Sequence, residues 1–298
     1  MQIGWEVEPK LDWLALAEAL AAGHDGPKAS VEDSFLYRGS DTILSRAAWI
    51  DGLGALVKTA TIFPGNVAQG RPSIDGGAML FDDTNGSLAA VIDFRLLTKW
   101  KTAGDSLLAA LRLAPQGAQT ILVVGAGTVA ASVIEAFGAG FPGASFTVWN
   151  RTEASGRALC ERTGAAWRDD LAAAVEEADI IVGCTMATEP WLNGEWLRPG
   201  QHVNLIGAYR PDMREVDDAA LARARVYVDS YDTTLDHIGE LKIPLATGAI
   251  AREAVLADYY ALGDFARTDG DITIFKNGGG AHLDLMTATY IQSVLSGT

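Results

Sequence analysis

The segment Ile121-Leu-Val-Val-Gly125-Ala-Gly127-Thr-Val-Ala130 carries most of the information about the fold. Its apolar run lacks polar alternation, which is typical of a parallel strand buried on both faces. Gly125 permits a tight turn, Gly127 lets the backbone approach a pyrophosphate, and Ala130 lets the following helix pack on the strand. The first N–H groups of that helix can face phosphates. The segment therefore predicts a dinucleotide-binding unit of the Rossmann type.

The next residues complete this unit and bear on the choice of dinucleotide. A helix is expected from Val129 to about Gly138, followed by an apolar strand over Ser145–Trp149. Sites that prefer NAD usually end this strand with an acidic residue, but here the tip is Asn150-Arg151-Thr152. A guanidinium and a hydroxyl attract a 2′-phosphate, so we expect NADP(H) to be preferred and NAD(H) to be possible. Because Glu153 is adjacent, Arg151 as a solvated turn residue is the alternative.

Composition limits the classes of function. The 298 residues, 49% of them hydrophobic, can bury a large core and predict two lobes. A net charge of −15 without an acidic tail argues against nucleic acid or an anionic membrane as a partner. There is no apolar run of roughly 18 residues and no signal-peptide pattern, so a cytoplasmic location is expected. Cys160 and Cys184 lack a partner at metal or redox spacing, so we expect no metal site.

The first third of the chain has short predicted strands separated by turn residues, a pattern typical of an antiparallel sheet. A helix is predicted over residues 11–23, and the turn signal Asp82-Asp-Thr-Asn-Gly86 joins two of the strands that follow. A helix from about Thr98 to Leu113 ends at Pro115, where we place a domain boundary. The predicted strands cover residues 34–38, 42–49, 55–63, 78–82 and 87–92.

The remainder alternates between strands and helices, which predicts an α/β domain with a parallel sheet. A strand followed by a glycine-rich turn leads into a last helix that ends near Leu295. The predicted strands cover residues 179–184, 202–206, 225–229 and 272–276, and the predicted helices cover 169–177, 217–223, 233–241 and 251–262.

Five separated blocks resemble the ornithine cyclodeaminase and mu-crystallin family of nicotinamide-dependent amino-acid and imine enzymes. They are Val57–Asn66, Leu97–Ala103, the glycine loop at 121–130, Gly194–Glu215 and Thr273–Lys276, in the order found in the family. The resemblance implies a Rossmann domain at residues 116–274, inserted into an α+β substrate-binding and dimerisation domain at residues 1–115 plus 275–298. It also implies a homodimer.

The resemblance implies a carboxylate clamp made of Lys58, Lys101 and Arg46. Lys101 stands where the family carries an arginine, which exchanges a bidentate fork for a point charge. Arg46 occupies the place of a further carboxylate-binding arginine. Lys58, expected to be catalytic as well, lies in an otherwise apolar strand, where a lysine is costly unless it is paired.

The segment Gly207-Ala208-Tyr209-Arg210-Pro211 departs from the deaminating members of the family, which carry an aspartate at the third position. Its replacement by Tyr209 disfavours catalysis that starts from a cationic amine. An iminium acid already carries the proton that polarises its C=N bond, so a carboxylate clamp and a hydride donor suffice. Tyr209, expected to be a catalytic-site residue, either donates its hydroxyl to the substrate or packs on the nicotinamide.

The remaining site residues are expected around the strand ends. Gly279 and His282 are predicted to contact the substrate; His282 is a candidate proton donor, although an expected exposed position favours a structural role. Asp229 either lies near the nicotinamide or caps the next turn. The predicted cofactor contacts are Thr102, Gly125, Gly127, Thr128, Val129, Asn150, Arg151, Thr152, Thr185, Met186, Gly207, Asp229 and Lys276.

The expected function is NADPH-dependent reduction of a small imino acid, with 1-pyrroline-2-carboxylate to L-proline as the leading reaction. The alternatives are a reductase of another imino acid, such as iminosuccinate or a six-membered ketimine, and an amino-acid dehydrogenase. For a substrate with an extra carboxylate, Arg71 or Arg95 would supply the extra cation. An ornithine cyclodeaminase with bound NAD and a non-catalytic NADPH-binding protein also remain open.

Overall fold

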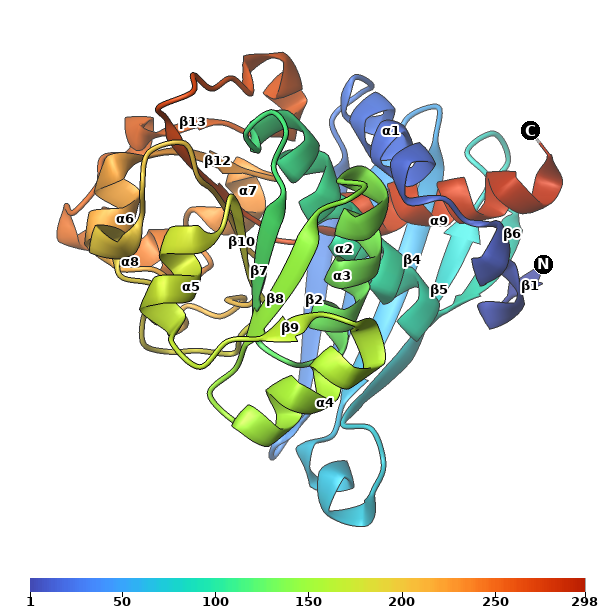
Figure 1. The fold of residues 1–298 in the computed structure, drawn as a ribbon. Helices are drawn as coiled ribbons and strands as arrows, with labels where there is room; N and C mark the ends of the chain where they lie inside the picture. Colours follow the sequence, from blue (N-terminus) through green and yellow to red (C-terminus); the bar gives the residue numbers. More distant parts are fainter. Residues whose placement is uncertain (298) are drawn as a thin grey trace. The chain divides into compact units, whose positions relative to one another are not determined.

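The computed structural model describes residues 1–297 and divides the chain into two compact units (Figure 1). The first unit comprises Met1–Lys101 and the residues from Gly280 onward, and the second comprises Thr102–Gly279. Helix α2 (Phe94–Leu113) passes from one unit into the other. The sequence-based boundaries at 115/116 and 274/275 differ from this division, because the first two turns of α2 pack with the first unit.

A six-stranded sheet forms the first unit. Five strands follow one another as antiparallel neighbours, and a short strand at the N-terminus, which the sequence pattern did not predict, pairs in parallel with the last of them. The strands are β1 (Gln2–Ile3), β2 (Ser30–Arg38), β3 (Asp41–Ile50), β4 (Gly54–Ile62), β5 (Ile74–Phe81) and β6 (Leu88–Asp93), with short 3-10 helices at Trp5–Lys10 and Pro64–Gln69.

The two faces of this sheet have different surroundings. Helix α9 (Ala281–Ser296) packs on one face and lies beside α1 (Trp13–His24), as Figure 1 shows. The backbone N–H of Asp12, the cap of α1, donates to the Tyr290 hydroxyl at 2.8 Å. The opposite face exposes apolar side chains, among them Trp49 and Met79. Among the described residues of the first unit, helices therefore cover the sheet on one side only.

The second unit contains an eight-stranded parallel sheet in the order β13-β12-β14-β11-β10-β7-β8-β9. The first strand of this sheet in chain order is β7. The chain then adds β8 and β9 on one side of β7 and continues with β10 on the other side, and this reversal makes β7 the switch point of a doubly wound sheet. The strands are β7 (Thr120–Val124), β8 (Ser145–Trp149), β9 (Ala166–Trp167), β10 (Ile180–Gly183), β11 (His202–Leu205), β12 (Ala224–Val228), β13 (Val255–Ala257) and β14 (Ile272–Lys276).

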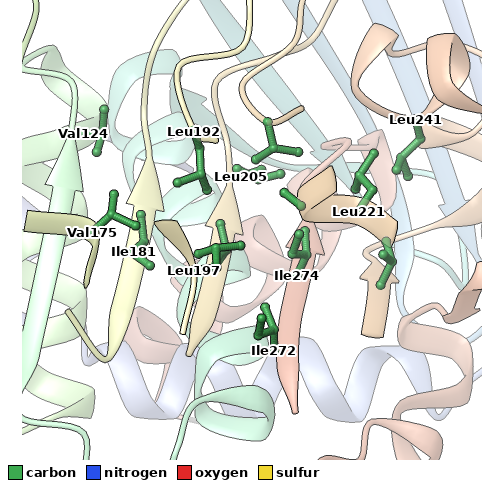
Figure 2. Close-up of a cluster of buried hydrophobic side chains, with 14 of the residues drawn as sticks. Val124, Val175, Ile181, Leu192, Leu197, Leu205, Leu221, Leu241, Ile272 and Ile274 are labelled. Carbon is green, nitrogen blue, oxygen red and sulfur yellow. The ribbon is translucent and has the colours of Figure 1, made fainter. Parts of the chain in front are cut away.

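Helices connect these strands and cover them with apolar side chains. Figure 2 shows Val124, Ile181, Leu205 and Ile274, from four neighbouring strands, in one buried cluster. All residues of β10, β11 and β14 are buried, which confirms the interpretation of unalternated apolar runs as strands covered on both faces. The helices are α3 (Thr128–Gly140), α4 (Glu153–Thr163), α5 (Leu171–Glu177), α6 (Asp218–Arg223), α7 (Tyr231–Thr234) and α8 (Gly239–Thr247), with 3-10 turns at Gly194–Trp196, Arg252–Ala254 and Tyr259–Asp264.

Several local predictions are wrong. The helix expected over residues 251–262 is two 3-10 turns around β13, because this segment pairs with β12 at the edge of the sheet. The helix expected over residues 233–241 is split between α7 and α8 by the extended backbone at Ile238. Helix α4 was missed because its apolar periodicity is weak: it buries only Gly156 and Leu159.

Candidate active site

The glycine loop after β7 has the geometry of a phosphate-binding turn. Gly125 has a left-handed φ of 114°, and a Cβ there would lie 2.7 Å from the Cys184 carbonyl oxygen. Gly127 caps α3, and apart from Gly127 itself and its two chain neighbours no heavy atom of the described chain lies within 4 Å of the position its Cβ would take. No side chain of the described residues caps the α3 amides, which leaves them available to a pyrophosphate. A dinucleotide fits this loop.

The tip of β8 leaves its arginine open to solvent. Asn150 Nδ2 donates to the Thr152 carbonyl at 2.8 Å, which shapes the turn. Glu153, whose charge was the reason to doubt a phosphate-binding role for Arg151, is paired with Arg157 at 2.7 Å one helical turn later. Arg151 is exposed and makes no ion pair with any of residues 1–297. A basic, unengaged side chain thus stands where the adenosine ribose is bound in Rossmann domains.

The loops after β10 and β11 lie in contact. A Cβ on Gly207 would be 1.8 Å from the Thr185 carbonyl oxygen, so only glycine permits this approach. Met186 and Tyr209 are exposed, and the Arg210 guanidinium lies 5.6 Å from the centre of the Tyr209 ring. Tyr209, which follows β11, is therefore open to solvent beyond the carboxyl end of this strand.

Asp229 and Lys276, both predicted to contact the cofactor, lie inside the second unit. Neither side chain exposes any surface. Asp229 Oδ2 accepts hydrogen bonds from the amides of Gly278 (2.8 Å) and Gly279 (2.5 Å), and Lys276 Nζ donates to the Leu205 carbonyl at 2.9 Å. Burial raises the pKa of Asp229 while these amides oppose the rise, and burial lowers the pKa of Lys276. In the described chain both side chains hold the backbone at the strand ends, which for Asp229 agrees with the turn-capping alternative. Their contact with a cofactor stays a prediction.

In the first unit, the strand register aligns the predicted carboxylate-binding cations. Asp33, Arg46 and Lys58 are directly opposite one another on β2, β3 and β4. Lys58 Nζ lies 2.7 Å from Asp284 Oδ1 on α9, with the two side chains 7% and 0% exposed. It also lies 4.8 Å from the centre of the Phe94 ring. Arg46 forms a two-point pair with Asp33, at 3.2 and 2.7 Å.

Lys101 on α2 completes this group, which we call the cation cluster: Arg46, Lys58 and Lys101 with Asp33 and Asp284. Lys101 is 9% exposed and makes no ion pair with any described residue. Burial lowers the pKa of Lys58 and Asp284 opposes this effect; burial raises the pKa of Asp284, but Lys58, Lys101 and Arg46 together bring it below its ordinary value. With three cations and two carboxylates, the cluster carries a net positive charge that favours an anion.

His282 is buried, contrary to the exposed position expected from sequence. It is 2% exposed and its ring packs edge-on against His24, with 5.4 Å between ring centres. Burial, reinforced by His24 and Lys101, lowers its pKa to about 3. The imidazole is therefore neutral near pH 7 and holds no proton to donate as an imidazolium, which favours the structural role.

Sequence reasoning missed Asp284 as the partner of Lys58. The signal was present: Leu283-Asp284-Leu285-Met286 places a carboxylate in an apolar stretch of the last helix, where a buried charge requires a counter-ion. It also missed Glu215, a fully buried residue whose carboxylate accepts hydrogen bonds from the loops after β10 and β11.

Comparison with known proteins agrees with this geometry. Residues 50–298 match the sequence model of the Ornithine cyclodeaminase/mu-crystallin family. The chain belongs to this family. A Delta(1)-pyrroline-2-carboxylate reductase of Paracoccus denitrificans is 48% identical over 298 residues, covering 97% of this chain and 94% of that protein.

Solved structures share the fold over the whole chain. The Delta(1)-pyrroline-2-carboxylate reductase of Thermococcus litoralis, in complex with NADH and L-proline, superposes with a TM-score of 0.89 at 22% identity, covering 100% of this chain and 98% of that one. An archaeal alanine dehydrogenase dimer with bound NAD gives 0.88 at 25% identity, covering 100% and 97%. The predicted family and the Rossmann-containing α/β fold class are confirmed.

Within residues 1–297, no helix combines the length and apolar character that crossing a membrane requires. The same residues contain no group of three or more His, Cys, Asp or Glu side chains arranged to hold a metal ion.

Proposed function

We propose that this protein reduces a small imino acid with NAD(P)H, and that the substrate is 1-pyrroline-2-carboxylate, which yields L-proline. The cation cluster carries this proposal. A buried lysine without a counter-ion, Lys101, beside the buried Lys58–Asp284 pair suits a small organic anion such as a carboxylate. The 48% identical relative named for the same reaction supports this substrate.

The chain's residues have two tasks in this reaction. The glycine loop and the strand ends of the second unit would hold a nicotinamide dinucleotide, which would supply a hydride. Lys58 and Lys101 bind the substrate carboxylate, and Arg46 adds its charge while it stays tied to Asp33. Reduction would move the C=N electron pair of the substrate to its nitrogen, which in the iminium form already carries its proton. No protein acid is then required, consistent with a neutral His282 and with Tyr209 in place of an aspartate.

We further propose that NADP(H) is preferred over NAD(H). The exposed guanidinium of Arg151 suits a 2′-phosphate, and its acidic neighbour Glu153 is already engaged by Arg157. No carboxylate ends β8, so no acceptor for a ribose 2′-hydroxyl is present in the usual form there.

We infer a homodimer formed through the uncovered face of the six-stranded sheet. Two rows of apolar side chains cross this face, and Trp49 (55% exposed), Met79 (40%) and Leu88 (52%) belong to them. A contiguous apolar sheet face of this kind is typical of an interface with another protein. A second copy of the chain is the natural occupant, because the archaeal alanine dehydrogenase with the same fold is a dimer. A net charge of −15 supports a cytoplasmic enzyme without nucleic-acid or membrane partners.

Oxidation of NADPH, followed by absorbance against a panel of imino acids, tests the proposed reaction. We expect the highest kcat/KM with 1-pyrroline-2-carboxylate and L-proline as the product in chiral chromatography. Preferred turnover of iminosuccinate would replace the substrate, and ammonia release from L-ornithine would replace the reaction. Binding of NADPH without turnover of any imino acid would indicate a non-catalytic binding protein.

A further inference from the structure

Glu215 is a fully buried carboxylate that joins two loops of the second unit. Its Oε1 accepts hydrogen bonds from the Thr185 amide (3.0 Å), the Thr185 hydroxyl (2.7 Å) and the Trp191 indole N–H (3.3 Å). Its Oε2 accepts one from the Gly207 amide at 2.7 Å. The side chain has no exposed surface, so it contacts no bound ligand itself.

The two loops follow neighbouring strands at the ligand-binding edge of the sheet. Thr185 comes after β10 and Gly207 comes after β11, and both strands lie on the opposite side of β7 from β8. In doubly wound sheets a dinucleotide binds across the carboxyl ends of the strands at the switch point, with its adenosine half toward the strand that follows the glycine loop. The β10 and β11 loops therefore belong to the nicotinamide half.

Small residues make room for this bridge. A Cβ on Gly183 would lie 2.9 Å from Glu215 Oε1, and a Cβ on Gly207 would collide with the Thr185 carbonyl. The carboxylate thus fits in a space that glycines leave open, and it satisfies amides that would otherwise be buried without an acceptor. The position of one loop depends on that of the other through Glu215.

A second buried carboxyl group fixes the backbone of Glu215. The amides of Glu215 and Val216 donate to the two carboxyl oxygens of Glu240, at 2.8 and 3.0 Å. Burial, together with the charge of Glu215, raises the pKa of Glu240 to about 7, while the Lys276 ammonium opposes the rise. The Glu215 carboxylate thus binds the two loops, and the Glu240 carboxyl group in turn binds the backbone of Glu215.

We propose that Glu215 is a positioning residue for the nicotinamide half of the bound cofactor and acts through Thr185 and Gly207. The inference rests on the proposed function, since it assumes that a nicotinamide dinucleotide binds to this edge of the sheet. The glycine loop and the tip of β8, which would hold the adenosine half, make no hydrogen bond to the Glu215 side chain among the described residues. Disturbing Glu215 should therefore affect one half of the cofactor and spare the other.

The test compares a whole cofactor with a fragment that lacks the nicotinamide. Calorimetry measures the Kd of NADPH and of 2′-phospho-ADP-ribose for the wild type and for Glu215→Gln. The glutamine amide group would turn donors toward the Thr185 or Gly207 amide, leaving a buried donor without an acceptor. We expect NADPH to bind about ten- to hundred-fold more weakly. The fragment should bind within about two-fold of the wild type.

Glu195→Gln is the matched control, because Glu195 is an exposed glutamate of the same unit; it should change neither Kd. Thr185→Val removes one of the four hydrogen bonds that the Glu215 carboxylate accepts. It should weaken the binding of NADPH selectively, but less than Glu215→Gln does. This second variant keeps the test available if Glu215→Gln does not fold. Equal weakening of both ligands, or no weakening of either, overturns the inference. A wild type that binds neither ligand overturns the proposed function and this inference with it.

Discussion

The buried ion pair between Lys58 and Asp284 can be broken from either side. Its atoms are 2.7 Å apart and its side chains are 7% and 0% exposed. Removing one partner of a buried pair leaves an uncompensated charge and costs about 3–5 kcal/mol. The unfolding entropy of 298 residues, at about 2.1 cal/mol/K per residue, is about 0.6 kcal/mol/K. Lys58→Met or Asp284→Leu alone should therefore lower the Tm by about 5–8 °C, if the chain unfolds as one unit.

The double variant Lys58→Met/Asp284→Leu should recover most of this loss, because apolar side chains of similar volume often replace a buried pair without cost. Calorimetric or fluorescence-monitored melting of the four proteins gives the coupling between the two changes. The exposed pair Arg252–Asp236, 3.0 Å apart, is the matched control and should show little coupling. Additive losses of Tm at Lys58 and Asp284 would contradict the buried-pair interpretation.

In the same variants, we expect enzymatic activity and thermal stability to change independently of each other. The double variant should melt near the wild type yet reduce no imino acid, because the lysine that holds the carboxylate is gone. In Asp284→Asn, the pKa of Lys58, already lowered by burial, should fall further, because Asp284 is the group that opposes the fall. Since Lys58 is an ammonium only below its pKa, the basic limb of the kcat/KM profile should move to lower pH. An unchanged limb would show that Lys58 does not bind the substrate as an ammonium.

Three further predictions test the other proposals. Arg151→Ala should raise the KM for NADPH about ten-fold or more and that for NADH little, because a charge-assisted contact to the 2′-phosphate is lost; equal effects on the two KM values would remove the preference for NADP(H). Tyr209→Asp should lower the inhibition constant of L-proline, since a carboxylate at this position can pair with the ammonium of an amino acid; a constant that rises or stays the same would argue against this placement of Tyr209. Met79→Glu should give a monomer in sedimentation velocity, with the exposed Leu111→Glu as control; a dimer in both would exclude the uncovered sheet face as the interface.

Local patterns in the sequence were enough for the elements that form the cores of the two units. The strand-turn-helix at 121–138 and the run of antiparallel strands before Phe94 were predictable because burial on one or two faces imposes a period on neighbouring residues. The edge strands β1, β9 and β13 were not, because two or three residues at an edge bury too little apolar surface to leave a pattern.

The candidate site divides in the same way. The sequence alone determined the residue types, namely a glycine loop, a basic tip after β8 and lysines in apolar surroundings, because each is visible within a short segment. Only the tertiary structure decided which charges are compensated. Asp284 pairs with Lys58 although 226 positions separate them in the sequence, and Glu215 accepts hydrogen bonds from the loops of Thr185 and Gly207. It also decided that His282 is buried and neutral. Burial and pairing depend on residues brought together from distant parts of the chain, and no local pattern contains that information.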